Sequence, residues 1–114
     1  MGLQIVSPAE EIKSFQFAHA SGTTAKLPIV LNALTMIPLN TAGAAAQNTM
    51  VYEAEIKGAP KTAPQTWAVG ETLYFDPATG KFTNVAGALI ACGRVLEAAG
   101  SADTTSGLIA FRGF

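Results

Sequence analysis

The sequence predicts an all-β protein, a small antiparallel β-barrel or jelly-roll-like sandwich with a short N-terminal arm and helical turn. Short runs of β-branched and aromatic residues recur along the chain, and clusters of Gly, Pro, Asn and Asp separate them. A strict two-residue alternation in the middle of the chain is also typical of a strand. The 114 residues suit a single domain. We expect an N-terminal arm with the first strand over residues 1–17 and one barrel or sandwich domain over residues 18–114.

The first strand is expected to follow a helical turn. Residues 7–10, Ser-Pro-Ala-Glu, are typical of a helix start, because Ser7 can cap the turn and Pro suits its first position. Residues 13–17 then alternate and place Phe15 and Phe17 on one face, which predicts a strand.

Three strands are predicted in the middle of the chain. Residues 29–31 and 35–37 are short apolar runs typical of buried strands. Residues 52–57 alternate between uncharged and charged side chains, so we expect one face in the core and the other in solvent. Residues 41–48 are small and polar and are expected to form a loop.

A β-hairpin over residues 73–83 is the sharpest local prediction. Its turn, residues 76–80, reads Asp-Pro-Ala-Thr-Gly, with Pro early and Gly late. Residues 86–99 combine helix-favouring Ala and Leu with two Gly residues and branched pairs, so a helix and a buried strand both stay open. A loop over residues 100–107 and a final strand over residues 108–111 complete the chain.

The composition indicates a protein that works in an assembly. Hydrophobic residues make up 49% of the chain and charged residues 13%, about half the usual charged share. Mean hydropathy is +0.32. Because so few charges poorly cover a small globule, we expect copies of the chain or a larger partner to cover part of its surface. The alternative is an Ala- and Thr-rich monomer with a neutral surface.

The charge pattern argues against two classes of partner. The net charge is −1 and the chain has no basic run, so we predict no nucleic-acid binding and no binding to an anionic membrane surface. The single cysteine, Cys92, lies in an apolar run and is expected to be a buried, inert thiol.

The sequence offers no catalytic or metal-binding pattern, so we predict no enzymatic activity, no cofactor and no metal. His19 is the only histidine and lacks partners for a zinc site. Glu53 and Glu55 share a strand face with Lys57, and the alternation explains all three as a solvated face. Trp67 either anchors a sugar or protein neighbour or closes one end of the core.

Several features follow one another in order over residues 50–111. A strand with a charged face ends in Gly and Pro near residues 58–61. Trp67 opens a stretch of aromatic, Gly, acidic and Tyr residues that ends at Asp76. The hairpin turn, an apolar run and a loop with Gly, Asp and Thr follow. In this order they resemble the capsid cement (decoration) proteins encoded in head gene clusters of tailed phages and prophages.

This resemblance implies a virion structural protein on the outer surface of an icosahedral capsid, synthesised in the host cytoplasm. Its partners would be the major capsid protein, whose subunits it would bridge and stabilise, and further copies of itself in a dimer or trimer. The alternatives are a tail or head–tail joining protein and a carbohydrate- or ligand-binding β module that uses Trp67. The family carries no catalytic motif.

The predicted assembly interface lies mainly in the N-terminal segment. Residues 1–17 are expected to act as an arm that reaches a neighbour, because the apolar residues near the start are not needed for a hairpin core. The alternative is an ordinary edge strand. The candidate interface residues are Leu3, Ile5, Val6, Phe15, Phe17 and Trp67.

Overall fold

One curved antiparallel sheet dominates the computed structural model, which describes residues 3–114. Over these residues the sheet contains nine strands and curls into a half-barrel, which confirms the all-β prediction. The order along the sheet is β3-β4-β5-β9-β8-β6-β7, and β1 and β2 also pair with β5. The elements are β1 (Gln4–Ile5), the 3-10 helix η1 (Ala9–Glu11), β2 (Lys13–Ala18), β3 (Ile29–Leu31), β4 (Leu34–Pro38), β5 (Gln47–Lys57), β6 (Thr72–Asp76), β7 (Lys81–Thr83), β8 (Ala91–Val95) and β9 (Ile109–Arg112).

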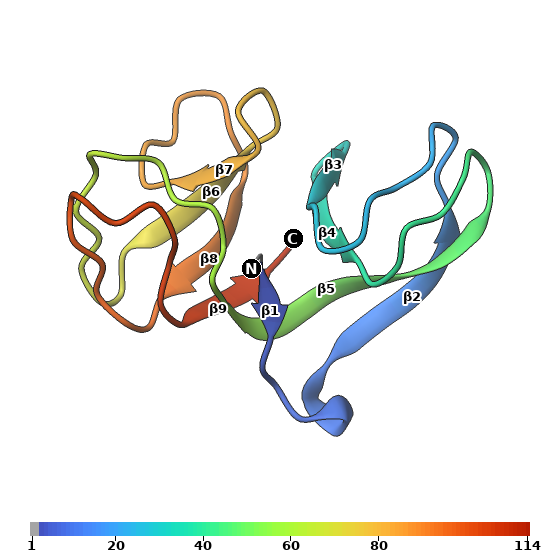
Figure 1. Cartoon of the computed structure of the whole chain (residues 1–114), viewed down its shortest axis with the longest axis horizontal. Coiled ribbons are helices and arrows are strands. Elements are labelled where there is room, and N and C mark those ends of the chain that lie inside the picture. Colours follow the sequence, from blue (N-terminus) through green and yellow to red (C-terminus); the bar gives the residue numbers. More distant parts are fainter. Residues whose placement is uncertain (1–2) are drawn as a thin grey trace.

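The long strand β5 joins two lobes of the molecule. Figure 1 shows β6 to β9 on the left, β2 to β4 on the right, and β5 crossing between them. Val51 pairs with Ser14 of β2 on one side and with Ile37 of β4 on the other. Further along, Glu53 pairs with both Lys13 and Arg112. Both edges of β5 are therefore occupied, and each lobe depends on it.

A β-bulge lies near the middle of β5. Lys13 pairs with Glu53 and Ser14 pairs with Val51, so Tyr52 is an extra residue with no partner in β2. A bulge bends its strand and changes which side chains face each side. Residues 53–57 alternate as predicted, whereas Tyr52 at the bulge is only half-buried and Met50 and Val51 are both fully buried. The predicted loop over residues 41–48 is shorter than expected, because Gln47 and Asn48 already pair with β2.

The hydrophobic core joins side chains from β4 through β9. Trp67 closes one end, with 1% of its surface exposed and its Nε1 donating to Gln65 Oε1 at 3.1 Å. Of the two predicted roles of Trp67, this position fits the one in the core. The core cluster consists of Leu3, Ile37, Val51, Ala54, Ile56, Ala59, Trp67, Leu73, Phe75, Phe82, Cys92, Val95, Ala99, Ile109 and Phe111.

A buried lysine holds the loops of the left-hand lobe together. Lys61 is 1% exposed, and its ammonium donates to the carbonyl oxygens of Thr62 (3.2 Å), Gln65 and Asp103 (3.3 Å). It also lies 5.4 Å from the centre of the Trp67 ring, where the negative face of the ring attracts a cation. All three ammonium protons have acceptors, which a buried charge requires.

The N-terminal segment runs along β5 of its own chain. The predicted helical turn is present as η1, but no side chain caps it. The expected cap by Ser7 is wrong, because its Oγ instead accepts a hydrogen bond from the Glu55 amide at 2.6 Å. Residues 1 and 2 of the predicted arm lie outside the described residues. The division at residue 17 and the arm that reaches a neighbour stay predictions.

The C-terminal half follows the predicted order of strands. The hairpin of β6 and β7 is confirmed, and Asp76 accepts the amides of Ala78 (2.9 Å, on Oδ1) and Gly80 (2.8 Å, on its carbonyl). The ambiguous stretch over residues 86–99 contains the strand β8, so its helical alternative is wrong. Residues 3–114 include no helix that is long and apolar enough to cross a membrane.

Replacing Lys61 tests the role of its buried ammonium. Lys61→Met keeps most of the side-chain volume but removes the ammonium donor from three carbonyl oxygens, of which only that of Thr62 keeps another donor, the Gln65 amide. We therefore expect a loss of about 2–4 kcal/mol in unfolding free energy. Urea denaturation measures the unfolding free energy of the wild type and of the variant. Lys57→Met, at an exposed position of β5, is the control and should change stability by less than about 0.5 kcal/mol. Equal effects of the two substitutions would contradict the role of Lys61.

The buried thiol predicts a dependence of stability on pH. Burial raises the pKa of Cys92 from its ordinary 9.0 to about 12, opposed in part by a backbone hydrogen bond at Phe75. The thiol's contribution to the unfolding free energy is therefore complete below pH 9.0 and is lost as pH rises toward about 12. The reason is that the thiol of the unfolded chain releases its proton at a lower pH than the buried thiol does. The unfolding free energy of the wild type minus that of Cys92→Ala should fall over this range. A constant difference would show that the thiol is not shielded.

Candidate assembly surface

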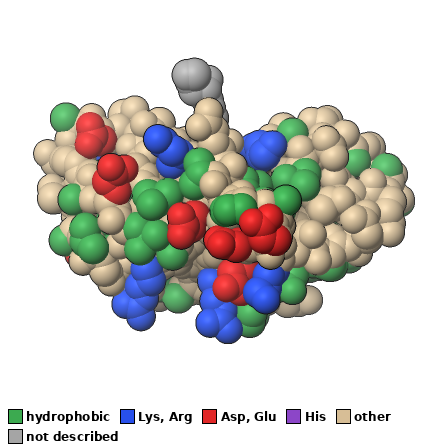
Figure 2. Space-filling view, turned by 90° about the horizontal axis from the view of Figure 1, so that it is seen from below, with side chains coloured by type: hydrophobic (Ala, Val, Ile, Leu, Met, Phe, Trp, Pro, Cys, Tyr) green, Lys and Arg blue, Asp and Glu red, His purple; other side chains and the backbone are tan. Residues whose placement is uncertain are grey.

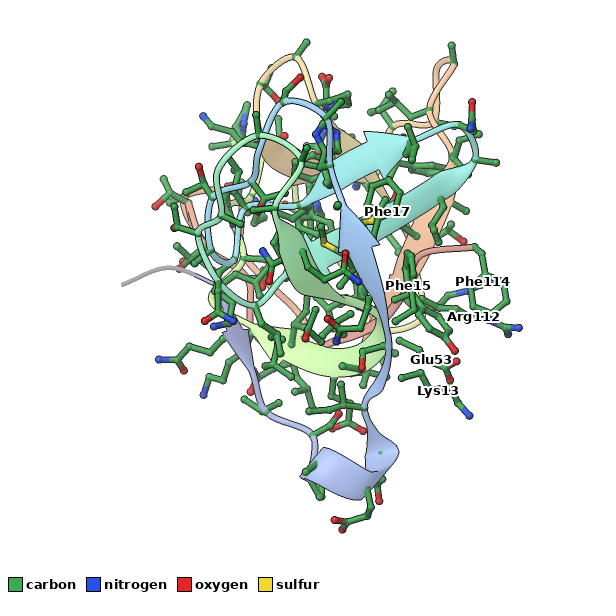
Figure 3. The ribbon with its side chains drawn as sticks, turned by 90° about the vertical axis from the view of Figure 1, so that its right-hand side faces the viewer. Lys13, Phe15, Phe17, Glu53, Arg112 and Phe114 are labelled. Atoms are coloured by element: carbon green, nitrogen blue, oxygen red, sulfur yellow. The ribbon has the colours of Figure 1, made fainter. Side chains whose placement is uncertain are left out.

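A row of aromatic side chains crosses β2, β5 and the C-terminus. The ring centres of Phe17 and Phe15 are 6.1 Å apart, those of Phe15 and Tyr52 6.0 Å, and those of Tyr52 and Phe114 5.7 Å. These separations fall within the range of favourable aromatic pairs. The rings of Phe15, Phe17 and Tyr52 are half-buried, and Phe114 is 58% exposed. Figure 3 shows Phe15, Phe17 and Phe114 on the same side of β2, with Arg112 next to Phe114. We call Phe15, Phe17, Tyr52, Phe114 and the adjoining Arg112 the aromatic strip.

Polar groups lie at both ends of the aromatic strip. The guanidinium carbon of Arg112 lies 4.5 Å from the centre of the Phe114 ring, a distance typical of a cation–π contact. At the other end, the His19 ring meets Phe17 edge-on at 6.2 Å. His19 Nδ1 accepts the Ser21 amide at 3.1 Å, which fixes the ring locally. His19 therefore acts as a structural side chain in this arrangement.

The backbone fixes the position of Phe114. The amide of Gly113 donates to the Tyr52 carbonyl at 2.8 Å, and its carbonyl accepts from the Thr35 amide at 2.8 Å. A Cβ at residue 113 would clash with the carbonyl oxygen of Thr35, so only Gly fits between β4 and β5. The chain end is consequently held on both sides, and the next residue is directed onto Tyr52.

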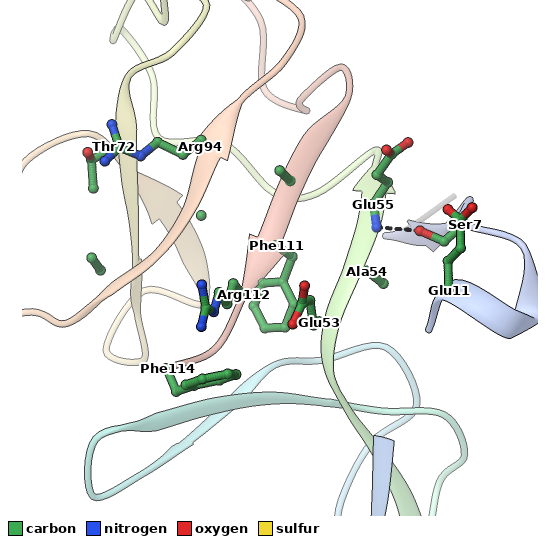
Figure 4. A pocket seen from close by; sticks show the side chains of 13 residues that line it. Ser7, Glu11, Glu53, Ala54, Glu55, Thr72, Arg94, Phe111, Arg112 and Phe114 are labelled. Carbon is green, nitrogen blue, oxygen red and sulfur yellow. Dashed lines mark hydrogen bonds between the residues drawn. The ribbon is translucent and has the colours of Figure 1, made fainter. Parts of the chain in front are cut away.

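A shallow groove of about 560 Å³ adjoins the strip on the outer face of β5, β9 and β8. Figure 4 shows Glu53 and Glu55 on one side and Arg94 and Arg112 on the other. In Figure 2 the charged side chains gather over the middle of the molecule. The described residues contain no cluster of three or more His, Cys, Asp or Glu that could hold a metal. The mixed charges agree with the solvated face expected for this strand.

The lobe that carries most of the strip is nearly free of charge. Residues 14–52 contain a single charged residue, Lys26. The right-hand end of the molecule in Figure 2 accordingly shows no charged side chains. Its loops are joined by the buried Asn48, whose Nδ2 donates to Thr23 Oγ1 at 2.9 Å and to the Asn40 carbonyl at 2.5 Å. A partner that covers this lobe would desolvate few charges, which lowers the cost of association.

Comparison with known families adds an independent finding. A family model described as phage cement protein matches residues 6–111. The chain belongs to the phage cement protein family. Comparison with curated proteins and with solved structures gives no match. Membership confirms the resemblance noted in the sequence and gives the chain a structural role in the phage capsid.

The structure separates the six interface candidates of this cement family member. Phe15 and Phe17 lie together in the strip. Leu3 is 5% exposed and Trp67 is 1% exposed, so both are core residues in a single copy. Because the ligand-binding alternative needs an accessible Trp67, this burial removes its basis. The remaining two candidates, Ile5 and Val6, lie at β1, where Ile5 packs against the core and Val6 is 41% exposed.

Three residues of the strip were missed by sequence reasoning. Tyr52 was expected to point with Ala54 and Ile56 toward the core, but the bulge leaves its ring beside Phe15. Arg112 and Phe114 follow the predicted last strand without forming a motif. An Arg two positions before an aromatic residue also occurs in many strands that form no interface, so this spacing was too weak a signal. The interface as a whole stays a prediction.

Proposed function

We propose that this protein binds the outer surface of an icosahedral phage capsid through the aromatic strip and bridges neighbouring major capsid protein subunits. Membership of the cement family supports a role in the capsid. The observation that supports this contact surface is the row of half-buried rings that ends in the exposed Phe114 and in Arg112. Synthesis in the host cytoplasm and a position outside the shell belong to the same proposal.

The composition of the strip suits a protein contact. Aromatic residues and Arg dominate the binding energy of protein interfaces, since they bury large areas around a fixed geometry. The rings of the strip touch one another, so their side chains lose little further freedom on binding. Phe114 is the most exposed of the four and offers the largest area to a partner.

Stabilisation of the shell follows from mass action. A ligand that binds only the assembled capsid shifts the equilibrium toward assembly in proportion to its occupancy. Each copy that contacts two subunits opposes their separation, and many copies act together on one shell. The net charge of −1 and the absence of a basic run favour the outer surface, away from packaged DNA.

Co-sedimentation with capsids that lack this protein tests the proposal. We expect saturable binding at a fixed ratio to the major capsid protein and a higher melting temperature of the loaded shells. The protein analysed alone by light scattering is the companion measurement. Failure to bind, together with a stable ring in solution, would favour a tail or head–tail joining protein instead.

Phe114→Ala tests the strip directly. Because Phe114 is 58% exposed at the chain end, its removal should leave the fold intact but weaken capsid binding about 5- to 30-fold. Val69→Ala is the matched control, since Val69 is 65% exposed in a loop of the other lobe. Quantitative co-sedimentation gives both affinities, and urea denaturation checks both folds. Equal affinities for the two variants would exclude Phe114 from the contact.

A further inference from the structure

Strand β2 presents the longest free edge among the strands of residues 3–114. It has six residues and pairs only with β5. The terminal strands of the sheet, β3 and β7, have three residues each, and β1 has two. Figure 1 shows no strand beyond β2 on its outer side. One edge of this sheet is therefore long, and the others are short.

The long edge lacks the usual protection against pairing. Proteins commonly guard edge strands with Pro, with charged side chains, with bulges or by keeping them short. The sequence of β2 is Lys-Ser-Phe-Gln-Phe-Ala, without Pro. Its one charge, Lys13, precedes the bulge, and residues 14–18 pair regularly with β5. An unguarded edge of this kind is a template for another strand.

We propose that β2 pairs with β2 of a second copy, antiparallel about a twofold axis at Gln16, and that the two sheets become one. In such an isologous contact the same surface serves both copies. The proposal concerns the chain alone and does not depend on capsid binding.

The side chains of β2 determine the register. Residues directly opposite in an antiparallel pair point to the same face of the sheet. With the axis at Gln16, Phe15 lies opposite Phe17 of the second copy, and Ser14 lies opposite Ala18. The two Phe pairs then form one cluster of four rings on a single face. Aromatic pairs of this kind are among the most stabilising cross-strand neighbours.

The single charge of β2 favours a second copy as the occupant. Antiparallel pairing places the two Lys13 side chains at opposite ends of the contact, so they do not repel each other. The five residues nearest the axis are all neutral. Because the contact covers one strand edge, we expect a dimer that dissociates on dilution. If the proposed function also holds, the dimer carries two aromatic strips on one face and thereby two capsid contacts.

Charge substitutions at the axis test this dimer. Gln16 is exposed, and in the dimer it lies opposite Gln16 of the second copy. Gln16→Lys and Gln16→Glu therefore each place two like charges opposite each other. We expect each variant to dimerise at least about fivefold more weakly than the wild type. An equimolar mixture of the two variants should recover a dimer, because the facing charges are then opposite. Sedimentation velocity of the full chain over a concentration series measures the dimerisation of the wild type, of each variant and of the mixture.

A matched control removes the other contact of Gln16. Its Nε2 donates to Thr49 Oγ1 at 2.7 Å within one copy, and both charge variants disturb this hydrogen bond. Thr49→Val removes it without adding a charge and should dimerise like the wild type.

Several outcomes would overturn the dimer. A wild-type chain that stays monomeric at the highest concentration would do so, as would a dimer that neither charge variant weakens. Two weakened variants that fail to recover on mixing would exclude an axis at Gln16. Dimerisation without capsid binding would support the dimer and contradict the proposed function. Capsid binding by a strict monomer would support the proposed function and contradict the dimer.

Discussion

The two-sided pairing of β5 is the constraint on which the rest of the structure depends. Val51 and Glu53 each have partners on both sides, so strands from distant parts of the chain meet on one strand. The lobes share no other strand in the sheet order. The bulge at Tyr52 lets β5 bend between them. A change that straightens or shortens β5 would therefore disturb both lobes, whereas a change at β3 or β7 would affect one end of the sheet.

The candidate surface is a consequence of the same strand. At the bulge, the ring of Tyr52 lies next to Phe15, and the chain end held by Gly113 adds Phe114. The lobe around these rings is nearly free of charge, so covering it requires little desolvation. The proposed capsid contact uses the face of the aromatic strip, whereas the proposed dimer contact uses the backbone edge of β2 and brings Phe15 and Phe17 of the two copies together. Phe15 and Phe17 therefore take part in both proposed contacts.

Local chemistry explains which sequence predictions succeeded. The hairpin of β6 and β7 depends on a turn whose residues are adjacent, and the alternation after Tyr52 reflects one strand with two environments. The cap at Ser7 was wrong because a distant amide, that of Glu55, binds the hydroxyl. Residues 86–99 stayed ambiguous because Ala and Leu favour a helix, and only pairing with β6 and β9 makes β8 a strand.

By itself, the sequence determined the all-β class, the scarcity of surface charge and the family, because composition, turns and ordered short motifs are properties of neighbouring residues. Only the tertiary structure decided that Trp67 and Lys61 are buried, and which rings accompany Phe15 and Phe17. These outcomes depend on strand order and register between segments far apart in the chain. The backbone hydrogen bonds that set them are nearly the same for every residue type, so the sequence does not specify them locally.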